Sequence, residues 1–163
     1  MPLSFYSFHE ENSLIVTTIV GRLDGRELTD LFREQTADPR APKLTRHLVD
    51  LRLAEGSGPS MEVIRSLAWS SRAFLMRHAC KSHRTALVAV RDIDFGYARM
   101  FASFAEWLPC QVSVFRTMRE ACEWLEIDDE FETGARSAEA ATEAQGAPSC
   151  DDGEALGAVN FAG

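Results

Sequence analysis

The sequence predicts an α/β protein with a mixed sheet of about five strands flanked by four helices. Short apolar or β-branched runs alternate along the chain with longer segments in which apolar residues recur every three or four positions, as in amphipathic helices. The first two predicted strands are separated only by the polar stretch 10–13, which is typical of a hairpin. Each later strand follows a helix, which indicates parallel strands joined by crossover connections.

The boundaries of the elements follow from a few residue types. Residues 14–20 are rich in β-branched side chains, which suit a strand. Pro39 follows the first predicted helix and Pro109 the third, and proline cannot continue a helix. The predicted strand 85–90 is continuously apolar after Thr85, as expected for a central strand covered on both faces. The predicted strands are 3–9, 13–22, 46–52, 85–90 and 111–115, and the predicted helices are 26–37, 60–78, 95–108 and 117–126.

Charge divides the chain into two parts. Residues 1–128 carry 16 basic and 17 acidic side chains, whereas residues 129–163 carry 1 basic and 8 acidic ones. We therefore predict one domain, 1–128, followed by a disordered acidic tail, 129–163, whose Ala-, Gly- and Glu-rich composition buries too little to offset its ordering entropy. The nearly neutral body and the lack of a recognition motif argue against nucleic acid as a partner.

The sequence also predicts the cellular compartment. No stretch has the roughly 18 apolar residues that a transmembrane helix needs, and residues 1–4 lack the basic region of a signal peptide. The four cysteines include no close pair, which argues against a zinc motif and fits a reducing compartment. We expect a cytoplasmic protein.

Three stretches carry a resemblance to a known family. They are Leu-Val-Asp-Leu-Arg at 48–52, Gly-Tyr-Ala-Arg-Met-Phe at 96–101, and Val-Phe-Arg-Thr at 114–117 with Glu-Ala-Cys-Glu-Trp-Leu at 120–125. Over about residues 3–127 the chain resembles the STAS/SEC14 group of SpoIIAA-like bacterial proteins. The resemblance implies a SpoIIAA-like β/α superhelix. It also implies a regulatory role like that of anti-sigma factor antagonists, which dock a partner kinase and are phosphorylated on a serine after the middle strand.

Two serines are candidates for such phosphorylation. In the equivalent region, residues 55–60 read Glu-Gly-Ser-Gly-Pro-Ser, so the resemblance points to Ser57, and Ser60 is the second candidate. The free N–H groups and the dipole at a helix N-terminus favour a phosphate there. In the alternative interpretation Ser60 only caps the following helix, and Ser57 is a loop residue.

The predicted helix 60–78 carries a candidate contact surface. Arg65, Trp69 and Arg72 lie on one stripe, and no acidic residue occurs between positions 63 and 91. Trp and Arg are enriched at binding hot spots, and the positive charge favours an acidic protein partner, a lipid head group or a phosphorylated small molecule. A solvated helix face, or docking of the acidic tail, would explain the same pattern. Trp107 is expected to pack against the body.

Asp50 and Arg99 are further candidates at the carboxyl end of the sheet, where open α/β sheets form their sites. Together with Asp92 and Arg116 they could line a binding site there, or the arginines could simply pair with the carboxylates. We favour pairing.

The sequence contains no recognisable catalytic constellation. Its four histidines are scattered, and it has no Gly-rich phosphate loop or metal-ligand spacing. We expect no enzyme activity, no cofactor and no metal. The predicted function is a non-catalytic cytoplasmic regulatory or protein-interaction module. The alternative is a small carrier that binds a lipid or another anionic or apolar ligand between helices 60–78 and 95–108. A carrier requires an apolar pocket, whereas a docking module requires a closed core and an exposed patch around Trp69 and Arg72.

Overall fold

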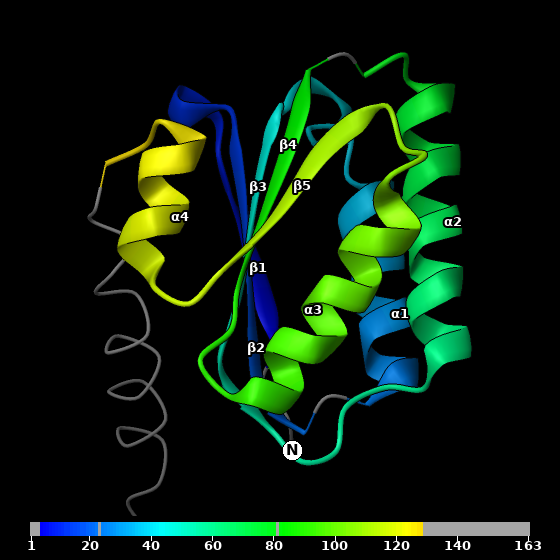
Figure 1. The fold of residues 1–163 in the computed structure, drawn as a ribbon. Coiled ribbons are helices and arrows are strands. Elements are labelled where there is room, and N and C mark those ends of the chain that lie inside the picture. Colours follow the sequence, from blue (N-terminus) through cyan, green and yellow to red (C-terminus); the bar gives the residue numbers. More distant parts are fainter. Residues whose placement is uncertain (1–3, 23, 81, 129–163) are drawn as a thin grey trace, which may run out of the picture.

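The computed structural model describes residues 4–22, 24–80 and 82–128, and it contains the predicted mixed sheet and helices (Figure 1). The strands are β1 (Phe5–His9), β2 (Leu14–Arg22), β3 (Arg46–Glu55), β4 (His83–Val88) and β5 (Cys110–Phe115). The α-helices are α1 (Gly25–Ala37), α2 (Met61–Arg77), α3 (Asp92–Ala105) and α4 (Met118–Leu125), and short 3-10 turns occupy Glu10–Asn12 and Ala41–Lys43. The predicted tail, 129–163, lies outside the described residues.

The strands follow one another across the sheet in the order β1-β2-β3-β4-β5. β1 pairs with β2 in antiparallel fashion, and all later neighbours are parallel, as the sequence predicts. Because each crossover advances the sheet in the same direction, a constant right-handed connection places the crossover helices on one face. Figure 1 shows this arrangement, with α1, α2 and α3 on one side of the sheet and α4 on the other. We call these sides the crossover face and the α4 face.

The α4 face is densely packed. Leu48 and Val88 from the sheet and Leu125 from α4 are all 0% exposed, within a cluster of eight buried residues. α4 begins with a capping box, in which the Thr117 hydroxyl accepts the Glu120 backbone N–H and the Glu120 carboxylate accepts that of Thr117. Short as it is, α4 packs on β3, β4 and β5 with its inward residues fully buried.

The crossover face has a different character. Successive side chains of a strand point to opposite faces, so Val49 and Leu51 of β3 face α1, α2 and α3. They belong to a second cluster, in which Val49 is only partly buried although β3 is the middle strand of the sheet. Val49 lines a cavity on this face.

Some boundaries and orientations differ from the sequence prediction. α3 begins at Asp92 instead of residue 95, because its acidic first turn, which resembles a loop, suits the positive end of the helix dipole. The predicted helix 60–78 ends one residue earlier, at Arg77, and His78 is exposed and caps the C-terminus of α2. Trp107 was expected to pack, and this is wrong, since its side chain is 81% exposed just beyond α3.

Candidate functional site

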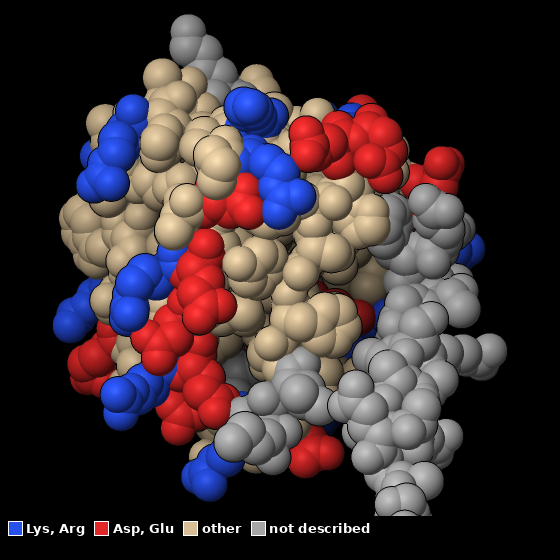
Figure 2. Space-filling model, turned by 180° about the vertical axis from the view of Figure 1, so that it is seen from behind, with Lys and Arg blue, Asp and Glu red and all other residues tan. Residues whose placement is uncertain are grey.

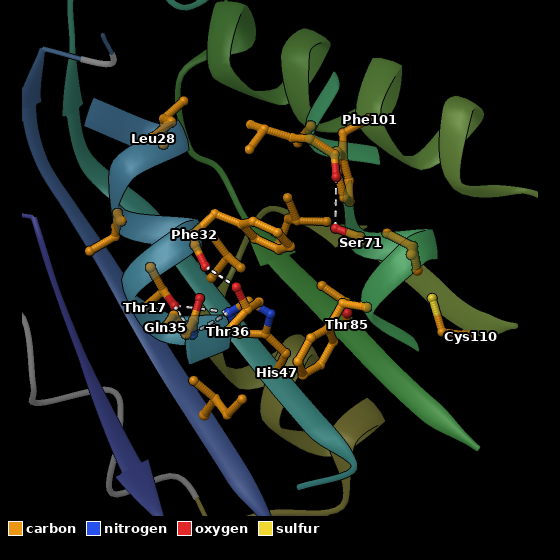
Figure 3. Close-up of a pocket in the computed structure, with 18 of the residues that line it drawn as sticks. Thr17, Leu28, Phe32, Gln35, Thr36, His47, Ser71, Thr85, Phe101 and Cys110 are labelled. Carbon is orange, nitrogen blue, oxygen red and sulfur yellow. Dashed lines mark hydrogen bonds between the residues drawn. The ribbon is translucent and has the colours of Figure 1, made fainter. Parts of the chain in front are cut away.

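A cavity of about 180 Å³ lies between the crossover face of the sheet and the helices α1, α2 and α3 (Figure 3). It is partly open to solvent. Most of its wall is apolar, with side chains from every surrounding element. None of the described residues that line it is Asp, Glu, Lys or Arg. The apolar side chains include Ile15, Ile19, Leu28, Leu31, Phe32, Val49, Leu51, Leu67, Phe74, Leu87, Phe101 and Val112.

One region of the wall is polar. The Gln35 side-chain amide donates to the Thr17 hydroxyl at 2.9 Å, and that oxygen lies 2.9 Å from His47 Nε2. The Gln35 amide nitrogen also lies 3.4 Å from His47 Nε2. Figure 3 shows these three side chains pointing toward one another from α1, β2 and β3. They form a connected hydrogen-bonding cluster in an otherwise apolar chamber.

The protonation state of His47 follows from its burial. Burial lowers the pKa of His47 to about 3, and the neighbouring His83 adds to this effect. The imidazole is therefore neutral at pH 7. After accepting from Gln35, the Thr17 hydroxyl still has one proton and one lone pair, so it donates to His47 Nε2 in one imidazole tautomer and accepts from it in the other. Burial also lowers the pKa of His83, opposed by a hydrogen bond to the Leu44 backbone.

Two further polar groups on this wall lack partners. His83 is 7% exposed and Thr85 is 8% exposed, and both line the cavity from β4. Within the described part of the chain, His83 Nδ1 has no hydrogen-bond partner. The Thr85 hydroxyl makes no hydrogen bond to the described residues either, and Figure 3 shows Thr85 on the cavity wall. Since buried polar groups in proteins are almost always hydrogen-bonded, each such group requires an explanation.

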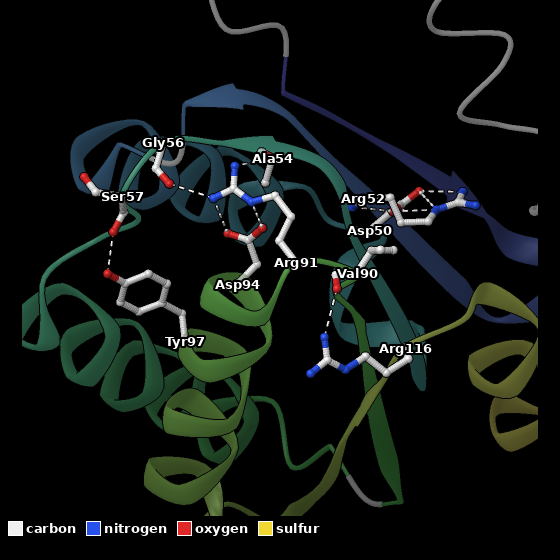
Figure 4. A network of polar contacts seen from close by, with 10 residues as sticks. All are labelled: Asp50, Arg52, Ala54, Gly56, Ser57, Val90, Arg91, Asp94, Tyr97 and Arg116. Atoms are coloured by element: carbon white, nitrogen blue, oxygen red, sulfur yellow. Dashed lines mark hydrogen bonds and ion pairs between the residues drawn. The ribbon is translucent and has the colours of Figure 1, made fainter.

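The carboxyl end of the sheet is closed by a polar network that clamps the loop between β3 and α2 (Figure 4). Arg91 donates to the backbone carbonyls of Ala54 at 3.2 Å and Gly56 at 2.6 Å. Its Nε lies 2.9 Å from the Asp94 carboxylate, which is 1% exposed. Burial raises the pKa of Asp94 and the Arg91 charge opposes that rise.

A tyrosine completes the clamp. The Tyr97 hydroxyl donates to the Ser57 carbonyl, and its ring lines the cavity beside Pro59. Gly58 has φ +72°, and a Cβ there would lie 2.1 Å from the Tyr97 ring. Glycine is thus required at this position for conformation and for space. The loop therefore lies against the cavity at Pro59 and is held in place by contacts from α3.

The two predicted phosphorylation candidates lie on this loop. Ser60 is the N-cap of α2, with its hydroxyl accepting the Val63 N–H at 3.4 Å, as the capping interpretation predicts. Ser57 is exposed. Phosphorylation of either serine stays a prediction.

The candidate contact residues of α2 are on the outside of the molecule. Trp69 is 64% exposed, and the Arg72 guanidinium lies 5.9 Å from its ring centroid. Arg72 also donates to the Trp107 carbonyl at 2.9 Å, which brings the two tryptophan-bearing segments together. Arg65 is exposed on the same helix, and Met76 is 60% exposed. The cavity and the exposed patch are thus separate features.

The structure does not bring Asp50 and Arg99 together. Asp50 is 3% exposed and pairs with Arg52, with Nη2 and Oδ2 2.8 Å apart, whereas Arg99 is exposed on α3. Arg116 does pair with Asp92 at 2.8 Å, in keeping with the favoured interpretation. These charges serve local pairing and do not converge on one site.

The polar wall of the cavity was missed at the sequence level. Thr17 and Thr85 count as ordinary strand residues, and His47 was one of several scattered histidines. The alternation of side chains along β3 could have identified His47. Residues two apart on a strand share a face, so His47 points toward the crossover helices together with Val49 and Leu51.

Other classes of site are not seen in the described ranges. No group of three His, Cys, Asp or Glu side chains there could hold a metal ion. No described helix is long and apolar enough to cross a membrane. Figure 2, which views the molecule from behind, shows basic and acidic side chains interspersed over that face.

Comparison with known proteins adds a fold description. No family model and no curated protein matches the chain. Among solved structures, an uncharacterised protein from Shewanella loihica PV-4 is similar, and it is described as a DUF3478-family member with a SpoIIAA-like fold. The alignment covers 76% of this chain and 93% of that chain, with 19% identity and a TM-score of 0.45. The fold named is the one that the sequence resemblance implies, and nothing about chemistry transfers at this identity.

Proposed function

We propose that this protein is a non-catalytic binding protein, or carrier, for a small and mainly apolar ligand held between the sheet and the crossover helices. The observation that carries the proposal is the cavity of about 180 Å³ with its apolar, uncharged lining. This corresponds to the alternative function derived from the sequence, with the position extended from α2 and α3 to include α1.

The size of the cavity sets the size of the ligand. An engineered cavity of about 150 Å³ in another protein binds benzene, so this one accommodates roughly one substituted ring. Such a ligand buries on the order of 150–200 Å² of apolar surface, which at about 25 cal/mol per Å² gives about 4–5 kcal/mol. That corresponds to a Kd of roughly 0.2–1 mM.

The free energy of the fold also favours a ligand. Residual cavity volume costs about 24 cal/mol per Å³ in core-truncation series. For a volume of about 180 Å³ the cost is at most about 4 kcal/mol, an upper bound because this cavity is partly open to solvent. A ligand that restores the missing contacts offsets this cost, so binding stabilises the folded chain.

Catalysis has little support from the chemistry of the cavity wall. Burial raises the pKa of the Cys110 thiol to about 11, so this residue carries no thiolate at neutral pH. His47 and His83 are neutral, and none of the described residues of the lining is an Asp or Glu that could pair with them. The lining offers hydrogen bonds but no activated nucleophile.

The test is ligand binding by the full chain with ethylbenzene as the probe, measured by calorimetry and by thermal unfolding. We expect saturable binding and a higher Tm. Val49→Phe should fill the cavity and abolish binding, whereas Val90→Phe, the same change at a side chain 56% exposed, should not. Ser71→Leu, which fills the cavity from α2, replaces Val49→Phe if that variant does not fold. Failure of the unmodified chain to bind, or binding by the cavity-filling variant as tight as that of Val90→Phe, would refute the proposal.

A second candidate function is the regulatory or protein-interaction role, and a specific observation favours it. Trp69, Met76 and Trp107 are 64%, 60% and 81% exposed. Arg72 lies over the Trp69 ring and donates to the Trp107 carbonyl. Large exposed apolar groups beside arginine are typical of interaction sites. The fitting partner is a protein surface that is apolar and acidic.

This second candidate is tested by charge reversal. Arg65→Glu combined with Arg72→Glu should abolish affinity capture of a partner from the native host while leaving the fold intact. Arg26→Glu combined with Arg119→Glu, which reverses two exposed arginines on α1 and α4, is the matched control. Retention of every partner by the α2 variant would exclude this face.

A further inference from the structure

We infer that the cavity ligand carries one uncharged hydrogen-bonding group, such as a phenolic or alcoholic hydroxyl, and that Thr85 and His47 bind this group. The inference rests on the proposed function, which concerns only the apolar cavity, and it specifies the chemical class of the ligand.

The two residues lie side by side at one end of the chamber. His47 on β3 is in register with Thr85 on β4, so the two are direct neighbours across a parallel pair. Both are near the amino-terminal ends of their strands, with His83, the first residue of β4, two positions before Thr85. Residues two apart on a strand share a face, so all three line the same part of the wall.

These residues have unused hydrogen-bonding capacity. Within the described residues the Thr85 hydroxyl and His83 Nδ1 have no partner, although both side chains are more than nine-tenths buried. His47 Nε2 is occupied by Thr17 and Gln35, which leaves Nδ1 as the ring nitrogen that can bind a ligand. A ligand hydroxyl, which both donates and accepts, matches the Thr85 hydroxyl and His47 Nδ1.

The charge of the wall determines the charge of the ligand. None of the described lining residues is a cation or an anion, and both imidazoles are neutral. An ionised carboxylate or phosphate would enter without a counter-charge, at a cost of several kcal/mol. The arginines that the sequence suggested for anion binding, Arg65 and Arg72, are on the outer side of α2. The cavity therefore selects against an anion.

The rest of the chamber fits the apolar part of such a ligand. Toward the carboxyl ends of the strands the wall consists of Ile19, Leu51 and Leu28, with Phe101 from α3. A molecule with one polar end and a ring-sized apolar body would place its hydroxyl at Thr85 and its body against these side chains.

The experiment compares three probes that differ in one substituent: ethylbenzene, 4-ethylphenol and 4-ethylbenzoate. Titrations use the full chain at pH 7.5, where a phenol is neutral and a benzoate is ionised. We expect 4-ethylphenol to bind about 3–10 times more tightly than ethylbenzene, as one net hydrogen bond provides. We expect 4-ethylbenzoate to bind at least about 10 times more weakly than 4-ethylphenol.

Variants at Thr85 assign the contact. Thr85→Val keeps the shape and removes the hydroxyl, so the preference for 4-ethylphenol over ethylbenzene should disappear while ethylbenzene still binds. Thr85→Ser keeps the hydroxyl and should retain the preference. Thr29→Val makes the same change outside the cavity, at an exposed hydroxyl that donates to the Gly25 carbonyl at 2.8 Å, and should change nothing.

The outcomes separate the two proposals. If ethylbenzene binds but 4-ethylphenol binds no better, or if the preference survives Thr85→Val, the assignment of a polar end at Thr85 is wrong and the apolar carrier function stands. Binding of 4-ethylbenzoate as tight as that of 4-ethylphenol overturns the neutral class. If none of the three probes binds, the proposed function itself fails.

Discussion

The two faces of the sheet are built from the same strands, yet one is densely packed and the other hollow. On β3, Leu48 of the α4 face is 0% exposed, while its neighbour Val49 on the crossover face is only partly buried. On the α4 face one short helix lies directly on the sheet. On the crossover face three longer helices must share the surface, and their mutual contacts limit how closely they approach it.

One contact between the helices illustrates this limit. α1 and α2 meet closely at Gly25, where an added Cβ would lie 2.7 Å from a methyl group of Val63. Farther along, bulky side chains such as Phe32 and Phe101 line the space between the helices and the sheet. The comparison teaches that hydrophobicity alone does not close a core. The arrangement of the helices decides whether apolar side chains meet one another or a cavity.

The largest expected difference between the faces concerns truncation of leucine. Leu48→Ala should lower the free energy of unfolding by about 2–5 kcal/mol, because it removes a fully packed side chain and leaves a new cavity. Leu67→Ala, on the cavity wall of α2, should cost less than half as much, because some of its surface already lacks contacts. Urea unfolding of both variants measures the difference. Equal costs would show that the crossover face is as well packed as the α4 face.

The faces should also differ in their response to acid, because His47 and His83 belong to the crossover face. The folded pKa of His47, about 3, lies below the ordinary value of 6.5, so the unfolded chain binds more protons as the pH falls. Stability is therefore complete above about pH 6.5 and is lost toward pH 3. His47 alone should account for about 2 kcal/mol between pH 7.5 and pH 5.

Urea unfolding at these two pH values provides the measurement. His47→Gln should remove most of the loss, whereas His78→Gln, at an exposed position on the end of α2, should leave it unchanged. A loss of stability in His47→Gln as large as that of the unmodified chain would contradict the burial of the imidazole in a low-dielectric wall.

The sequence predicts the elements and the topology of the sheet because those depend on periodicity and on boundary residues such as Pro39 and Pro109. It does not predict the cavity, because a cavity depends on how the helices pack against the sheet. A valine at position 49 fits the alternating pattern of a strand whether the core beside it is filled or contains a cavity. The polar wall was missed for a related reason. Thr17, Gln35 and His47 come from three separate elements, and only the tertiary fold brings them within 3.4 Å of one another.

The smallest expected effect gives the most direct comparison of the two faces. The same substitution, Val to Ile, should raise the free energy of unfolding on one face and lower it on the other. Val49→Ile adds one methylene group to the cavity wall of β3 and keeps the β-branched shape that suits a strand. It should raise the free energy of unfolding by about 0.8 kcal/mol, the value of one buried methylene. Val88→Ile adds the same group on the α4 face, where Val88 is 0% exposed, and should lower it by about 1–3 kcal/mol through overpacking. Thermal and urea unfolding of the ligand-free protein measure both variants. A cost at Val49 as large as that at Val88 would mean that the crossover helices settle against the sheet in solution, and that the ligand-binding cavity is closed.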